Sequence, residues 1–188
     1  MRVAAACLAV SFACGVATAR PIVIDFQELE FVGENWIYLP GDYSSQGYTL
    51  SNGHFAYFGT LDAWYPGSTA MWNDNTNTQA VLTADSGLPF GLVSIDLSPL
   101  LGAGIVPTTL HLQGYLNGAL VGDQLLATSG IGRVLEHFTL GSEFMNVDKV
   151  VFVDDYPYTQ FDNITLVPTP GVIGLAGMLG IVAARRRR

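Results

Sequence analysis

The chain has 188 residues, of which 16 are acidic, 8 are basic and 2 are cysteines. Between Pro21 and Leu166 only Arg133 and Lys149 are positive, so the formal charge of that stretch is two minus sixteen, −14. Such a negative surface repels phosphate backbones, which argues against nucleic-acid binding, and it attracts divalent cations. The alternative is that the acidity only keeps an exported protein soluble.

The first 19 residues have the pattern of a secretory signal peptide. Arg2 precedes an apolar run, and Ala17-Thr18-Ala19 supplies the small residues that signal peptidase requires, so we expect cleavage after Ala19. The run is short for a membrane span, which makes a retained N-terminal helix the weaker interpretation. Both cysteines lie in this segment, and bulky Phe12 before Cys14 makes a poor lipidation site. The mature domain is therefore expected to contain no disulfide.

The expected domain, residues 20–166, follows the rules of β-strands. Short runs rich in Val, Ile, Thr, Tyr and Phe are separated by clusters of Gly, Asn, Asp, Ser and Pro, and no helical period persists for three turns. The runs predict eleven strands, at 22–26, 36–39, 48–50, 55–58, 79–83, 91–97, 108–116, 119–126, 134–140, 147–153 and 160–166. This pattern favours an all-β fold, with two packed antiparallel sheets in a jelly-roll-like sandwich.

A hairpin around Asn117-Gly118 is the strongest local prediction. The run 108–116 alternates apolar and polar residues, which is typical of a strand with one buried face. Asn-Gly then supplies the two residues with positive φ that a type I′ turn needs. In the strand at 91–97, the same alternation predicts that the buried face is made by Val93, Ile95 and Leu97.

Candidate sugar contacts come from tryptophans and from the polar face of one predicted strand. The longest stretch without a regular pattern is 59–78, and long loops in compact domains are often functional. Sugars stack on aromatic rings and form hydrogen bonds with neutral polar groups. The candidate contacts are Trp36, Trp64, Trp72, His111, Gln113 and Tyr115. The alternatives are tryptophans that cap one end of the sandwich and a polar face that is merely solvated.

The sequence contains none of the common catalytic motifs. GxSxG, HExxH, P-loop and GxGxxG patterns are absent, and His54, His111 and His137 lie on separate predicted strands without ligand-spaced neighbours. The carboxylates leave a glycosidase pair open, yet no two are marked as facing each other across a cleft. We therefore expect a chain that is not an enzyme and has no zinc site.

The last 22 residues form a tail of three parts. Val167, Pro168, Thr169, Pro170 and Gly171 make a short stiff spacer, because proline is expected to stop the preceding sheet. The uncharged run 172–184 reaches about 20 Å as a helix, short of the ~30 Å hydrocarbon core, and arginine snorkelling with local thinning makes up the difference. The tail ends on Arg185, Arg186, Arg187 and Arg188. The positive-inside rule keeps this cluster cytoplasmic and the β-domain outside.

The order of these parts resembles the sorting tail of PEP-CTERM proteins, with Thr169 in the position where that family usually has glutamate. The resemblance covers the tail alone and accompanies the N-terminal signal peptide. It implies an exosortase-type sorting protease as partner, transient anchoring in the inner membrane of a Gram-negative-type bacterium, and delivery to the cell surface or an extracellular matrix. The alternative is an ordinary short C-terminal anchor with stop-transfer arginines.

The two ends of the domain carry a second, looser resemblance. An acidic first strand and the closing residues Phe161-Asp162-Asn163-Ile164 resemble β-sandwich modules of PEP-CTERM proteins and carbohydrate-binding jelly rolls. Many of these modules hold a structural calcium ion, so the resemblance implies Asp25, Glu28 and Asp162 as ligands of Ca²⁺. The alternative is that Asp162 faces solvent or caps a turn.

The predicted function is that of an exported, non-catalytic surface or matrix protein that is sorted through its tail. The alternative function is a carbohydrate-binding module that recognises exopolysaccharide or an environmental glycan.

Overall fold

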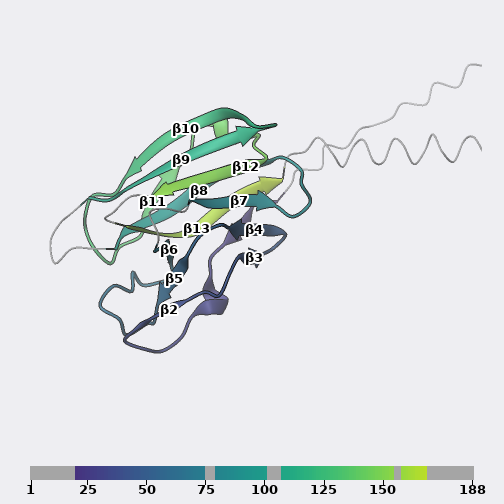
Figure 1. Cartoon of the computed structure of the whole chain (residues 1–188). Coiled ribbons are helices and arrows are strands. Elements are labelled where there is room, and N and C mark those ends of the chain that lie inside the picture. Colours follow the sequence, from purple (N-terminus) through teal and green to yellow (C-terminus); the bar gives the residue numbers. More distant parts are fainter. Residues whose placement is uncertain (1–19, 75–78, 101–106, 155–157, 169–188) are drawn as a thin grey trace, which may run out of the picture. The chain divides into compact units, whose positions relative to one another are not determined.

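Two antiparallel β-sheets make up the part of the chain that the computed structural model describes, residues 20–74, 79–100, 107–154 and 158–168 (Figure 1). The sheets pack on each other as a β-sandwich, which confirms the prediction of an all-β fold. The predicted signal peptide and the predicted membrane segment 172–184 lie outside the described residues. Among those that are described, no helix is long and apolar enough to cross a membrane.

The described residues form a sheet of seven strands and a sheet of six. The first has the order β11 (Glu136–Thr139), β8 (Phe90–Pro99), β13 (Thr159–Pro168), β6 (Met71–Asn73), β5 (Phe55–Phe58) and β2 (Trp36–Tyr38), with β1 (Ile22–Ile24) beside β13. The second has the order β10 (Ala119–Ala127), β9 (Thr109–Leu116), β12 (Lys149–Asp154), β7 (Ala80–Ala84), β4 (Tyr48–Ser51) and β3 (Tyr43–Ser45). Two short 3₁₀ helices, η1 (Gln27–Leu29) and η2 (Ser142–Phe144), complete the regular structure.

Each of the eleven predicted strands has a counterpart in the structure, whereas β3 and β6 were not predicted. The hairpin is confirmed, because Leu116 pairs with Ala119 and both turn residues have positive φ, 51° at Asn117 and 80° at Gly118. The last strand was predicted to end at residue 166, before the prolines of the tail. Strand β13 instead continues to Pro168, which still pairs with Phe90. Proline at the end of a strand costs the ladder little, because only its own missing N–H is lost.

A shared aromatic core joins the two sheets. The ring of Phe161 on β13 lies 5.3 Å from that of Phe152 on β12, and 6.0 Å and 6.5 Å from those of Phe26 and Phe55. All four side chains are at most 1% exposed. Burying each of them stabilises the fold by about 1.5–3 kcal/mol, so this cluster fixes how the sheets stack.

An irregularity between β8 and β13 changes which side chains face the core. Asn163 has a φ of 47°, and the ladder skips from Ser94 to Leu92, which leaves Val93 as an extra residue on β8. An extra residue reverses the alternation of a strand. Ile95 and Leu97 are buried as predicted, but Leu92 replaces Val93 in the core, so the prediction for Val93 was wrong.

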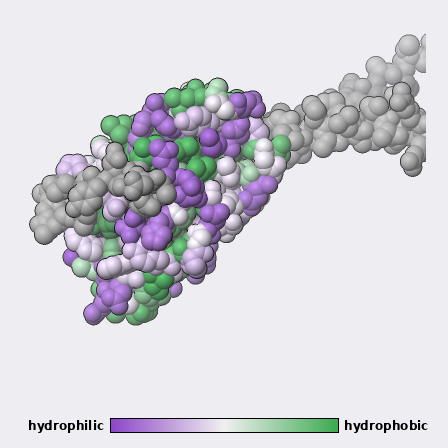
Figure 2. All heavy atoms as spheres, viewed as in Figure 1, coloured by the Kyte–Doolittle hydropathy of each residue, from purple (hydrophilic) through white to green (hydrophobic). Residues whose placement is uncertain are grey.

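Hydrophilic and hydrophobic residues are interspersed on the face of the domain that Figure 2 shows. Apolar surface on that face is divided into small areas by polar residues. Separate surface apolar residues are ordinary in folded proteins, so hydropathy alone marks no site there.

Candidate functional site

An aromatic hollow of about 210 Å³ is the main candidate site. We use the term aromatic hollow for the space lined by Trp36, Tyr38, Phe58, Trp64, Trp72, Asp74, Leu100 and Tyr158. Three neighbouring strands of the seven-stranded sheet, β2, β5 and β6, carry the first part of this lining. The remainder comes from the loop after β5 and from the residues next to β8 and β13.

Strand register explains why these side chains meet. Trp36 pairs with Phe58, Tyr38 pairs with Ala56, and Ala56 also pairs with Trp72. Paired residues and their second neighbours along a strand share one face of a sheet. The intervening residues, Tyr57 and Met71, belong to the core between the sheets. The aromatic hollow therefore lies on the outer face of the seven-stranded sheet, near its β2 edge.

The rings of the hollow form a buried floor and an exposed wall. Phe58 and Trp72 stack with ring centroids 4.3 Å apart at 22°, and both are about 5% exposed or less. Trp36 meets Phe58 edge to face at 6.4 Å and is 50% exposed. Together with Ala56 and Leu100, the floor residues make a second apolar cluster, separate from the main core. This cluster holds the floor rigid while the Trp36 face stays available to a ligand.

One carboxylate, Asp74, stands at the edge of the hollow. Its Oδ2 accepts a hydrogen bond of 2.6 Å from the Tyr38 hydroxyl, and this bond is the main reason that the pKa of Tyr38 is raised. The ring of Tyr38 stacks on that of His54 at 4.6 Å, and His54 Nδ1 lies 4.0 Å from Asp74 Oδ2. Asp74 also donates its main-chain N–H to the His54 carbonyl, at 2.8 Å. These contacts fix the carboxylate beside the aromatic rings.

The hollow contains two of the predicted ligand residues, Trp64 and Trp72, and also Trp36. The other three lie on β9, in the six-stranded sheet. There His111 Nε2 contacts Asp123 Oδ1, and the Tyr115 hydroxyl donates to Gln113 Oε1 at 3.0 Å. Lys149 Nζ lies 4.4 Å from the centre of the Tyr115 ring. The structure therefore separates the predicted ligand residues into two groups on different sheets.

Sequence reasoning missed Tyr38, Phe58 and Asp74 as members of the site. A signal for the first two exists, because Trp36 and Tyr38 are two residues apart, as are Ala56 and Phe58, and each pair shares one face of its strand. The pairing of β2 with β5 and of β5 with β6 is needed to join these faces. Asp74 has no such signal, because it follows a strand of only three residues.

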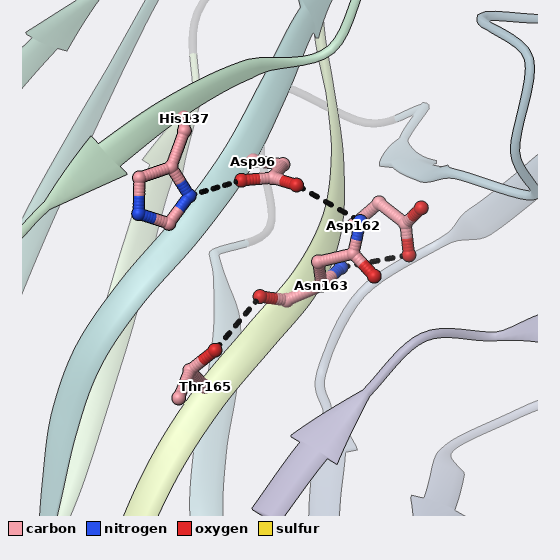
Figure 3. A network of polar contacts seen from close by, with 5 residues as sticks. All are labelled: Asp96, His137, Asp162, Asn163 and Thr165. Atoms are coloured by element: carbon pink, nitrogen blue, oxygen red, sulfur yellow. Dashed lines mark hydrogen bonds and ion pairs between the residues drawn. The ribbon is translucent and has the colours of Figure 1, made fainter.

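A polar network that runs from the exposed His137 to the buried Asp162 is the second candidate region (Figure 3). His137 Nδ1 lies 2.7 Å from Asp96 Oδ1, and Asn163 donates its side-chain amide to Asp96 Oδ2 at 2.9 Å. The main-chain N–H of Asn163 donates to Asp162 Oδ1 at 2.7 Å, which its left-handed conformation makes geometrically possible. The network thus links three adjacent strands, β11, β8 and β13.

Asp162 itself is completely buried, which rules out the interpretation that it faces solvent. Burial raises the pKa of its carboxyl to about 7, and the charges of Asp96 and Asp25 add to this effect. Hydrogen bonds from Ser68 and from the main chain of Asn163 act in the opposite direction. Oδ2 is buried without a hydrogen-bond partner among the described residues. A carboxyl in this setting favours its neutral form.

The three predicted calcium ligands differ in setting. Asp25 and Asp162 influence each other electrostatically, whereas Glu28 is exposed on η1 and accepts a hydrogen bond from the hydroxyl of Tyr43. Burial and this hydrogen bond raise the pKa of Tyr43. Within the described residues, no group of three or more His, Cys, Asp or Glu side chains is placed to hold a metal ion. The calcium site stays a prediction.

No protein-family model matches the chain, and no curated protein matches it in sequence. Among solved structures, the chain is similar to an arabinose-bound MgGH51 α-L-arabinofuranosidase, with 8% sequence identity and a TM-score of 0.44. The alignment covers 82% of this chain and 27% of that chain, so the chain spans about a quarter of the length of that structure. We base the function on the chemistry of the aromatic hollow itself.

Proposed function

We propose that this chain is an exported, non-catalytic protein whose β-sandwich binds carbohydrate in the aromatic hollow. The observation that carries the proposal is the hollow itself, where the exposed face of Trp36 stands beside the Tyr38 hydroxyl and the Asp74 carboxylate. A sugar ring stacks its apolar C–H face on an aromatic ring and directs its hydroxyls to polar groups. The hollow offers both kinds of contact within one space.

The size of the hollow favours one sugar ring. Its volume is about 210 Å³. Pockets for drug-sized ligands measure roughly 300–1,000 Å³, so this hollow accepts a smaller group. One ring of a glycan enters and packs on the half-exposed Trp36.

One acidic group stands among the aromatic rings of the hollow. Asp74 is the single carboxylate among its described lining residues. Hydrolysis of a glycosidic bond usually needs two carboxyl groups, placed on opposite sides of the bond. A site with one carboxylate and several aromatic rings is suited to holding a sugar.

Glycan-array and calorimetric binding to the purified full-length protein test this proposal. Trp36→Ala removes an exposed ring and is expected to weaken binding roughly fivefold or more, since stacking on a ring contributes on the order of 1 kcal/mol or more. Tyr115→Ala is the matched control, because it removes an aromatic ring from the outer face of the other sheet. Binding that follows Tyr115 and ignores Trp36, or the lack of binding to any glycan, would contradict the proposal.

Export and sorting are proposed on the pattern of the two chain ends. The signal peptide 1–19 delivers the domain across the inner membrane, and the tail 167–188 presents it to an exosortase-type protease for release to the cell surface or matrix. The jelly-roll-like connectivity of the sandwich is part of the same proposal. Mass spectrometry of surface material measures both ends of the chain, and an intact C-terminal Arg188 would overturn the removal of the tail.

A further inference from the structure

The aromatic hollow combines negative groups and contains no positive ones. None of its described lining residues is a lysine or an arginine. Lys149 lies over Tyr115 on the six-stranded sheet, away from the lining residues. The nearby imidazole of His54 is stacked on the ring of Tyr38, and its Nδ1 lies 4.0 Å from Asp74 Oδ2. A ligand carboxylate or sulfate would meet no fixed cation in this lining.

The tryptophan rings attract positive charge. The face of an aromatic ring carries a negative partial charge, and a cation over tryptophan gains ~0.5–2 kcal/mol, more when it is desolvated. Three tryptophans line the hollow, and Trp36 is half exposed while Trp64 is partly buried. Several rings around one small space are the arrangement that recognises ammonium groups.

Asp74 adds a full negative charge to these rings. A carboxylate can accept about four hydrogen bonds, and the Tyr38 hydroxyl supplies one of them. The main-chain bond from Asp74 to the His54 carbonyl holds the carboxylate in place. A charged N–H donor on a ligand forms a bond to such a carboxylate that is about twice as strong as the bond from a neutral donor.

The charge of the domain acts in the same direction over longer distances. With a formal charge of −14 between Pro21 and Leu166, the domain repels polyanions and attracts polycations. Acidic polysaccharides are therefore disfavoured before contact, and polymers with free amines are favoured.

We infer that the aromatic hollow selects a ligand with an ammonium group, namely an amino sugar whose amine is free, over neutral and acidic sugars. The amine is placed against Asp74 and the tryptophan faces, and the sugar ring packs on Trp36. This inference rests on the proposed carbohydrate binding and names the class of sugar.

The test compares three probes at pH 6 and low ionic strength, a glucosamine oligosaccharide, its N-acetylated equivalent and an oligogalacturonate of the same length. We expect the full-length protein to bind the glucosamine oligosaccharide roughly tenfold or more tightly than the N-acetylated one, and to bind oligogalacturonate weakest. Equal affinity for the first two probes would overturn the inference and leave the carbohydrate proposal standing. Tightest binding of oligogalacturonate would also overturn it.

Asp74→Asn separates the local effect from the charge of the domain. This variant is expected to lose roughly tenfold in affinity for the glucosamine oligosaccharide and to keep its affinity for the N-acetylated one. Asp123→Asn is the matched control, because it removes the same charge from an exposed position on the six-stranded sheet. Equal losses in the two variants would overturn a local role of Asp74.

Choline serves as a probe of the ammonium group without a sugar. We expect choline to bind at least tenfold more weakly than the glucosamine oligosaccharide, because it lacks the ring that packs on Trp36. If choline binds as tightly as the oligosaccharide, carbohydrate is not the ligand and the proposed function fails, while selection of ammonium by Asp74 is supported. If neither probe binds, the selection of an ammonium group is overturned, and binding of the N-acetylated oligosaccharide then decides whether the proposed carbohydrate function stands.

Discussion

The outer faces of the two sheets carry similar residue types in opposite situations. On the six-stranded sheet the polar and aromatic groups contact one another, as His111 does with Asp123 and Lys149 with the Tyr115 ring. On the seven-stranded sheet Asp74 is also paired, with the Tyr38 hydroxyl and His54, but the half-exposed ring of Trp36 borders a hollow. Side chains that contact one another stabilise a surface, whereas an exposed ring that borders a hollow can bind a ligand.

Buried polar atoms show the same contrast. Four buried side-chain oxygens lack a hydrogen-bond partner among the described residues, and they are Thr69 Oγ1, Ser98 Oγ, Gln160 Oε1 and Asp162 Oδ2. Three of them belong to β8 and β13 of the seven-stranded sheet, and the fourth precedes β6 of that sheet. An unpaired buried polar group costs about 1–3 kcal/mol of stability. Among the described residues, the groups with this cost lie in or next to the seven-stranded sheet.

Truncation of Trp72 is expected to give the largest difference in stability between variants of the two sheets. Trp72→Ala removes a ring that is 4% exposed and stacked on Phe58, so it should lower the free energy of unfolding by ~3–5 kcal/mol and remove ligand binding. Tyr115→Ala, on the other sheet, should lower it by less than ~1 kcal/mol. Urea unfolding of both variants measures the difference. Similar losses would mean that the hollow is not built on a rigid floor.

Neutralising Asp162 tests the unpaired polar groups. Because its pKa is about 7 in the folded protein and 3.8 in the unfolded chain, the folded state holds one more proton between these pH values. The contribution of the Asp162 carboxyl to the free energy of unfolding is therefore largest below pH 4, and it is lost as the pH rises through 7. We expect Asp162→Asn to match the wild type at pH 4 and to be more stable by on the order of 4 kcal/mol at pH 8.

Thermal and urea unfolding at several pH values measure this difference. Asp42→Asn is the control, because Asp42 is exposed, and its effect should be small at every pH. A wild type and an Asp162→Asn variant with parallel pH profiles would show that the buried carboxyl is fully satisfied, in contrast to the geometry around Oδ2.

The strands could be predicted where their own sequence defines a face. The alternation of apolar and polar residues predicted β9, and Asn117-Gly118 predicted the hairpin that joins it to β10. The hairpin between β3 and β4 was missed, although Gln46 and Gly47 have φ values of 52° and 84°, because glutamine is an unusual first residue for this turn. Strand β6 was missed because three residues are too few to show a period.

The site was predictable only in part, because it depends on contacts between distant segments. Single tryptophans could be named as candidates from their residue type. That Trp36, Trp64 and Trp72 share one hollow follows from the pairing of β2, β5 and β6, which no local pattern encodes. The extra residue Val93 likewise reversed the alternation on β8, since a bulge is set by both strands of a ladder.

The smallest expected effect concerns the six-stranded sheet. The side chains of His111 and Asp123 are 33% and 51% exposed, so their interaction is screened by water. Exposed ion pairs contribute roughly 0–1 kcal/mol, and we expect His111→Ala to lower the free energy of unfolding by less than ~1 kcal/mol and to leave ligand binding unchanged. A double-mutant cycle with Asp123→Ala measures the coupling of the pair.

Loss of ligand binding in His111→Ala would show that both sheets contribute to one ligand surface, and the separation of the two faces would then be wrong. Unchanged binding, together with the loss in Trp36→Ala, places the ligand on the seven-stranded sheet.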